Sequence, residues 1–245
     1  MTHPTAIVLL HGWGFRPTVC QGITDALVQN GMDHPILTPE LPLIPGSTLE
    51  TTLAQLAYDL PQESHLIGWS LGGEMALAFA LRYPDRVKSL SLISATPCFM
   101  NQADWPHGQP NTLLDDFDNR LANDAAALLK RFGLLIRHGD PQASKDRALA
   151  DSLLAHTEPN TSRLASGLNF LRSIDSRSAC TQALSSPLLI IHGDSDAVVP
   201  IAAAKWLQTA LHGNLYIVPA ASHALPLTHT AEIGQALRTH IASAS

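Results

Sequence analysis

The segment His65-Leu66-Ile67-Gly68-Trp69-Ser70-Leu71-Gly72-Gly73 decides the fold of this chain. Apolar residues up to Ile67 predict a short strand, and the good helix formers of residues 74–81 predict a helix directly after the glycines. A strand, a sharp turn with the pattern Gly-x-Ser-x-Gly and a helix together form a nucleophile elbow, which raises a serine hydroxyl above the edge of a sheet. We therefore predict that Ser70 is a nucleophile.

The glycines around Ser70 have a physical reason to be there. The turn is strained, and small residues are needed where the strand and helix backbones converge. Gly68 and Gly72 provide that room, and Gly73 lets the helix press on the sheet. The first turn of the helix also directs free N–H groups and the positive end of the helix dipole at an anion beside Ser70.

Strands and helices alternate along both ends of the chain. Continuous apolar runs such as 6–10 and 187–193 are typical of parallel strands that are buried on both faces. With helices between them, they predict a mostly parallel α/β sheet of about six strands with right-handed crossovers. The other expected strands are 35–38, 65–67, 88–94 and 214–219, and the helices are 18–30, 49–60, 74–83, 201–211 and 230–241.

The strand signal disappears in the middle of the chain. Residues 115–132, 144–156 and 161–171 have helical patterns, and no strong strand run separates them. We expect a helical cap at residues 98–183, inserted into a core made of residues 1–97 and 184–245.

The composition excludes several classes of protein. The chain of 245 residues is 45% hydrophobic and 15% charged, as in soluble globular proteins, and its net charge of −6 argues against nucleic acid as a partner. No apolar stretch reaches the roughly 18 residues that span a bilayer. Three widely spaced cysteines argue against a disulfide framework, and no metal-ligand spacing is present. We expect a cytoplasmic protein without metal or cofactor.

A serine nucleophile needs a histidine base and a carboxylate that orients the histidine. On this type of sheet they follow in the order Ser, Asp, His, each on a loop after a strand. We choose Asp196 over Asp194 because it lies further into its loop, and assign Asp194 to stabilising the loop. We choose His223, directly after the last strand, over His229 at the start of the final helix.

Ester hydrolysis forms an oxyanion, which backbone N–H groups stabilise. Leu71, the residue after the nucleophile, is expected to donate one of them. Trp13, in the glycine-flanked turn 11–14 after the first strand, is the natural source of the second. His11 is expected to form structural hydrogen bonds.

These motifs resemble the α/β-hydrolase superfamily. More narrowly, the turn 11–14, the elbow 68–73 and the segments 83–87 (Tyr-Pro-Asp-Arg-Val), 95–99 (Ala-Thr-Pro-Cys-Phe) and 105–106 (Trp-Pro) are similar to the pimeloyl-(acyl-carrier protein) methyl ester esterases of biotin synthesis. One departure is that only ten residues precede His11, so we expect the usual N-terminal strand pair to be reduced or absent.

The resemblance implies a serine carboxylesterase that releases methanol from the methyl ester of a carrier-bound pimeloyl chain and so ends its elongation. It implies Ser70 as the nucleophile, Asp196 as the orienting acid and His223 as the base. The implied substrate contacts also include Trp13, Leu71, Phe132, Gly133, Leu134, Leu135 and Ile136.

The implied partner is an acyl carrier protein, which is acidic. Five basic residues against two acidic ones between residues 130 and 147 can steer such a partner despite the overall negative charge. We expect a monomer that docks its carrier through Lys130, Arg131, Arg137, Lys145 and Arg147.

Three alternatives remain open at this point. A general carboxylesterase for short acyl esters and a C–C bond hydrolase would use the same three side chains. A non-catalytic receptor on this fold would not need them.

Overall fold

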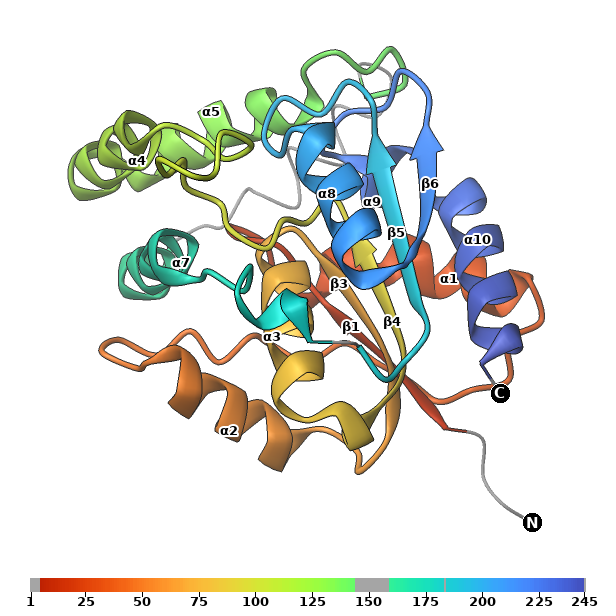
Figure 1. Ribbon diagram of the computed structural model, residues 1–245. Coiled ribbons are helices and arrows are strands. Elements are labelled where there is room, and N and C mark those ends of the chain that lie inside the picture. The colour runs from red at the N-terminus through yellow and green to blue at the C-terminus, as the bar shows by residue number, and fades with distance from the viewer. Residues whose placement is uncertain (1–4, 144–158, 183, 245) are drawn as a thin grey trace.

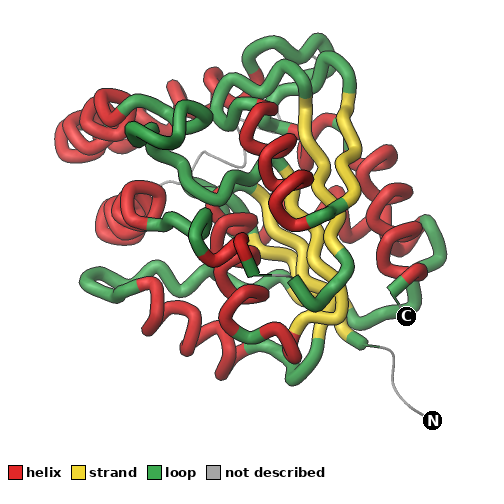
Figure 2. The backbone as a smooth tube through the Cα atoms, in the orientation of Figure 1, coloured by secondary structure: helices red, strands yellow, loops and turns green. Residues whose placement is uncertain are grey.

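The computed structural model describes residues 5–143, 159–182 and 184–244. Its centre is a twisted six-stranded sheet in the order β2-β1-β3-β4-β5-β6, and every neighbouring pair of strands is parallel (Figures 1 and 2). This confirms the predicted sheet. The strands are β1 (Ala6–Leu10), β2 (Ile36–Leu37), β3 (Ser64–Trp69), β4 (Val87–Ile93), β5 (Leu188–Gly193) and β6 (Asn214–Val218).

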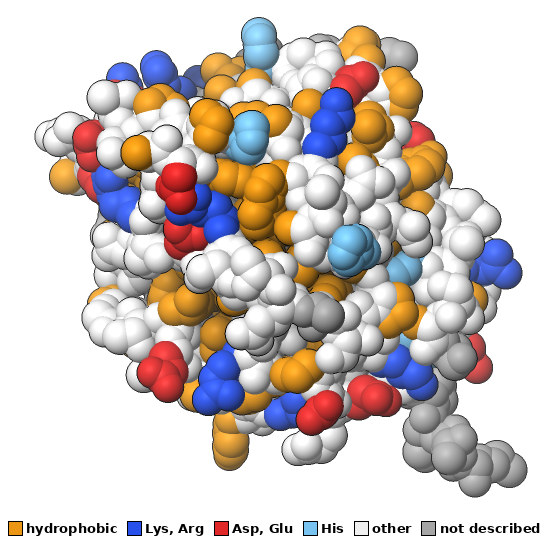
Figure 3. All heavy atoms as spheres, viewed as in Figure 1, with side chains coloured by type: hydrophobic (Ala, Val, Ile, Leu, Met, Phe, Trp, Pro, Cys, Tyr) orange, Lys and Arg blue, Asp and Glu red, His pale blue; other side chains and the backbone are white. Residues whose placement is uncertain are grey.

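Helices cover both faces of this sheet (Figure 1), and on the surface seen in Figure 3 hydrophobic side chains are interspersed with polar and charged ones. On one face, α1 (Gln21–Gln29) packs against α10 (Thr230–Ser243), which follows the short helix α9 (Leu225–Thr228). On the other face lie α2 (Leu49–Asp59), α3 (Leu71–Arg82) and α8 (Ile201–Leu211). The central strands are buried because apolar residues point from them to both layers of helices.

Three α-helices and the short 3-10 helix Ala179–Thr181 lie between β4 and β5 in the described part of the chain. The α-helices are α4 (Asn111–Asn123), α5 (Ala125–Arg137) and α7 (Thr161–Ser173). One helix was expected over residues 115–132, but the chain breaks at Asp124, whose backbone leaves the helical region and whose side chain accepts a hydrogen bond from the Ala127 N–H of α5. The helix expected at 144–156 lies outside the described residues.

Helices long and apolar enough to cross a membrane are absent from the described residues. Because all strands are parallel, β3, β5 and β6 end at the same edge of the sheet. The loops that follow these three strands carry Ser70, Asp196 and His223. The fold therefore gathers the predicted catalytic residues at one place.

Candidate active site

Ser70 occupies a strained turn between β3 and α3. Its φ of 56° lies in a region that residues other than glycine rarely adopt. A Cβ on Gly68 would lie 2.3 Å from the Gly72 carbonyl oxygen, and one on Gly72 would lie 2.4 Å from the Leu10 carbonyl oxygen. Only glycine fits at these two positions, as the elbow geometry requires.

His223 joins Ser70 to Asp196. Its Nε2 lies 2.9 Å from the Ser70 Oγ, and its Nδ1 lies 2.8 Å from the Asp196 Oδ2. Hydrogen bonds of this length in this order allow the imidazole to take a proton from the hydroxyl while the carboxylate holds the other ring nitrogen. The His223 and Asp196 side chains are fully buried.

The surroundings of Asp196 keep it ionised. Burial alone would raise the pKa of this carboxyl group. The positive charge that His223 can carry and their hydrogen bond outweigh burial, and a further hydrogen bond from the Val199 N–H helps to hold the pKa below its ordinary value. The other oxygen, Oδ1, accepts hydrogen bonds of 2.8 Å from the backbone N–H groups of Val198 and Val199.

Asp194 and His229, the alternatives to Asp196 and His223, make other contacts. Asp194 accepts a hydrogen bond of 2.7 Å from the Ala220 N–H, and so connects the loop after β5 to the loop after β6. His229 lies 3.3 Å from the Asp140 Oδ2, away from Ser70. His223 therefore contacts both Ser70 and Asp196, whereas Asp194 and His229 make other contacts.

The expected oxyanion donors flank Ser70. The Leu71 N–H is the first of α3 and has no acceptor within the helix. The turn that contains Trp13 lies against the nucleophile, because a Cβ added to Gly12 would come within 3.3 Å of the Ser70 Cβ. As expected, His11 is structural: its Nδ1 bonds to the Gly12 carbonyl oxygen and its Nε2 accepts from the Leu41 N–H.

Aromatic rings pack against one another close to the elbow. Trp13 packs edge-on against Phe132 of α5, with 4.9 Å between ring centroids, and Phe15 packs against Trp69 at the same distance. Trp69 in turn lies 5.8 Å from the His223 ring. Because Ser70 and His223 are themselves buried, their hydrogen bond lies in a largely apolar environment, which strengthens its electrostatics.

The predicted substrate contacts on α5 divide between the two faces of that helix. Phe132, Gly133 and Ile136 are buried, Leu135 is half-buried, and Leu134 is 53% exposed. The Ile136 carbonyl oxygen also accepts a hydrogen bond of 3.0 Å from the Ala224 N–H, next to His223. Leu134 therefore lies on the more exposed side of α5.

The predicted docking residues are also separated. Lys130 and Arg131 are exposed on the outer face of α5. Arg137, at the end of the helix, is buried rather than part of that surface. Lys145 and Arg147 lie outside the described residues.

The sequence analysis missed two charged features near the site. Glu74, in the first turns of α3, is buried, and burial raises its pKa well above the ordinary value. Arg163 of α7 pairs with Glu40 and lies 3.4 Å from His11 Nε2. A charged residue in the apolar run 71–81 was a signal for the first, whereas no spacing rule joins residues 40 and 163. No group of three or more metal-ligating side chains occurs among residues 5–143, 159–182 and 184–244.

Comparisons with known proteins agree with this geometry. The alpha/beta hydrolase fold family matches residues 60–230. A pimeloyl-(acyl-carrier protein) methyl ester esterase of Nitrosomonas europaea is 35% identical over 89% of this chain and 88% of its own length. The esterase of the same name from Aromatoleum aromaticum is 37% identical over 84% of this chain and 85% of its own.

Solved structures support the fold. A bromoperoxidase from Bacillus anthracis superposes with a TM-score of 0.84 at 23% identity, over 98% of this chain and 93% of its own. An esterase from Exiguobacterium antarcticum superposes with a TM-score of 0.80 at 19% identity, over 100% of this chain and 93% of its own. The sequence matches cover nearly the whole chain and confirm the resemblance seen in its motifs. The chain belongs to the α/β-hydrolase family and, within it, to the family of the pimeloyl-(acyl-carrier protein) methyl ester esterases.

Proposed function

We propose that this chain is a serine carboxylesterase that hydrolyses the methyl ester of a pimeloyl group carried on acyl carrier protein. The observation that carries the chemistry is the pair of hydrogen bonds made by His223, to Ser70 on one side and Asp196 on the other. The substrate class comes from relatives that bear this name and match most of the chain.

In the proposed mechanism, the Ser70 Oγ attacks the ester carbonyl while its proton passes to His223 Nε2. The N–H groups of Leu71 and Trp13 stabilise the oxyanion, each contributing on the order of 3 kcal/mol. His223 then protonates the leaving methoxide, and methanol departs from an acyl-Ser70 intermediate. A water molecule, deprotonated by His223, attacks this intermediate and releases the carboxylic acid and Ser70.

The cap is part of the proposal. Helix α5 of the proposed cap contacts the turn beside the elbow through Phe132 and Trp13, and in this proposal Phe132, Leu135 and Ile136 line the acyl channel. Lys130 and Arg131, exposed on the outer face of α5, attract the acidic carrier by long-range electrostatics. We also propose that the protein acts as a monomer in the cytoplasm, where its three buried, unpaired cysteines remain reduced.

Two assays test this function together. The chain is expected to restore growth without biotin in a bacterial strain that lacks its own esterase of this type, and its Ser70→Ala variant is not. The purified protein is expected to release methanol from the carrier-bound methyl ester. Hydrolysis of p-nitrophenyl esters without complementation would instead identify a general carboxylesterase.

A further inference from the structure

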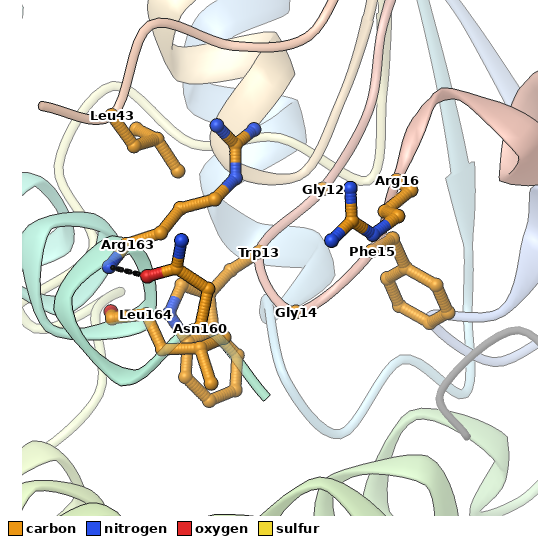
Figure 4. A pocket seen from close by; sticks show the side chains of 9 residues that line it. All are labelled: Gly12, Trp13, Gly14, Phe15, Arg16, Leu43, Asn160, Arg163 and Leu164. Carbon is orange, nitrogen blue, oxygen red and sulfur yellow. Dashed lines mark hydrogen bonds between the residues drawn. The ribbon is translucent and has the colours of Figure 1, made fainter. Parts of the chain in front are cut away.

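A second pocket lies beside the turn that carries Trp13 (Figure 4). Its cavity volume is about 30 Å³, enough for a small polar group. One wall is formed by residues 12–16 of that turn, and the opposite wall by Leu43 and the first turn of α7, from Asn160 to Leu164. Apart from the backbone N–H of Trp13, the proposed mechanism uses none of the groups that line this pocket.

Three side chains that can donate hydrogen bonds surround the pocket. Figure 4 shows the guanidinium groups of Arg16 and Arg163 and the side-chain amide of Asn160 around the same space. The Asn160 Oδ1 caps α7 by accepting a hydrogen bond from the Arg163 N–H, which leaves the amide nitrogen as a donor. The lining therefore combines guanidinium and amide donors with the apolar surfaces of Trp13 and Leu43.

Arg16, Arg163 and the neighbouring Glu40 form a cluster with a net positive charge. Glu40 pairs with both arginines: its Oε1 lies 3.5 Å from Arg16 Nη1, and its Oε2 contacts Arg163 Nη2. Two guanidinium groups and one carboxylate leave one positive charge. Burial lowers the pKa of Arg163, and the nearby charge of Arg16 lowers it too, although Glu40 opposes both. A second anion would stabilise the charged form of Arg163.

The pocket adjoins the nucleophile. Gly12 lines the pocket, and a Cβ on this residue would lie only 3.3 Å from the Ser70 Cβ. Trp13 lines the pocket as well, and its backbone is the proposed second oxyanion donor. The turn therefore touches both the nucleophile and the pocket that holds the arginines.

We propose that this pocket is a carboxylate subsite, which binds the free carboxylate at the far end of an acyl chain whose ester lies at Ser70. The forked N–H donors of a guanidinium match the two oxygens of a carboxylate, and the apolar walls accommodate methylene groups. The substrate class is half-esters of linear dicarboxylic acids. The inference rests on the proposed ester hydrolysis and adds a substrate that is not attached to a carrier.

The test compares matched substrates. Monomethyl esters of linear dicarboxylic acids of four to eight carbons are assayed against the methyl esters of the same length whose far end is a primary amide, an uncharged isostere of the carboxylate. The wild-type protein is expected to prefer the carboxylate by about tenfold or more in kcat/KM, which corresponds to about 1.4 kcal/mol, with a maximum at one chain length. An equal kcat/KM for both series would overturn the proposal.

Variants attribute the preference to the pocket. Arg163→Gln and, separately, Arg16→Gln are expected to reduce the ratio of the two kcat/KM values toward one. Arg16→Gln keeps the pair between Arg163 and Glu40, so it tests the subsite even where Arg163→Gln disturbs the fold. Arg120→Gln removes an ion-paired arginine of α4 and is expected to leave the ratio unchanged. If neither Arg163→Gln nor Arg16→Gln changes the ratio of kcat/KM between the two series, the proposed subsite is also contradicted.

A binding measurement separates this proposal from the proposed function. In the Ser70→Ala variant, calorimetry is expected to detect binding of the carboxylate half-ester but about tenfold weaker binding of the amide. Adding Arg163→Gln is expected to abolish that difference. If the wild-type protein hydrolyses neither these two series nor the carrier-bound methyl ester, the proposed function fails, while this binding measurement still decides the subsite. Equal binding of the two molecules would refute it.

Discussion

The Trp13 indole Nε1 donates a hydrogen bond of 2.9 Å to the Leu164 carbonyl oxygen, and thereby ties the turn after β1 to helix α7. The indole can approach α7 because residue 167 is a glycine: a Cβ there would lie 2.4 Å from Trp13 Cδ1. Since the Trp13 backbone is a proposed oxyanion donor, the packing of α7 positions this part of the site.

Gly167→Ala tests this coupling. The added methyl group must displace the indole, and overpacking of this kind costs about 1–3 kcal/mol. We expect a loss of stability in that range, measured by urea unfolding, and a fall in kcat that is larger than the change in KM, because the oxyanion donor moves. Asn169→Ala, at an exposed position of α7, is the matched control. An unchanged kcat would show that the indole and the donor are not coupled.

The backbone of Ser70 gives a prediction about stability. Its positive φ costs about 1–3 kcal/mol for a residue with a side chain, whereas glycine adopts this region freely. Ser70→Ala and Ser70→Gly should both abolish hydrolysis. Ser70→Gly should nevertheless be the more stable of the two by about 1 kcal/mol in chemical denaturation, after the greater entropy of unfolded glycine is subtracted. At Ser173, in helix α7, the same comparison should favour alanine, by roughly 1 kcal/mol.

Local sequence was sufficient for the parts of the site that lie at strand ends. Apolar runs predicted β3, β5 and β6, and parallel strands must end at one edge, so Ser70, Asp196 and His223 could be brought together without coordinates. The break at Asp124 was not predictable, because residues 115–132 favour helix without interruption. It makes α5 a separate helix that begins at Ala125.

The cluster of Arg16, Glu40 and Arg163 illustrates what a sequence pattern does not contain. Its members come from the turn after β1, the loop after β2 and helix α7. Their contact depends on how α7 sits over the core, which is a tertiary relationship without a fixed spacing. Buried Glu74 differs, because a carboxylate within an apolar helix can be recognised from sequence.

His65 should make the fold sensitive to acid. Burial, followed by the charges of His34, Lys88 and His240, lowers the pKa of His65 from 6.5 to about 4. The unfolded chain therefore binds a proton at a pH where the folded chain resists it, and stability falls as the pH drops from about 6.5 toward 4. His65→Gln should lose less stability than the wild type between pH 7.5 and pH 4 in urea unfolding. His138→Gln, at an exposed position, should follow the wild type, and parallel curves for all three would contradict the prediction.

The outer face of α5 gives a prediction about the carrier. Lys130 and Arg131 are exposed there. Replacing both with glutamate reverses the local charge that attracts an acidic protein. We expect the KM for a carrier-bound methyl ester to rise by about tenfold at low salt, with a smaller effect at high salt because counterions screen these charges.

The control for this prediction is a small ester such as p-nitrophenyl acetate, which does not contact the outer face of α5. The double glutamate variant should hydrolyse it at nearly the wild-type rate, because its elbow and His223 are unchanged. Arg238→Glu on α10, another exposed arginine, should leave both activities as they are. An equal loss on both substrates would mean that the glutamates disturb the cap. A carrier KM that stays constant would mean that the carrier approaches by another surface.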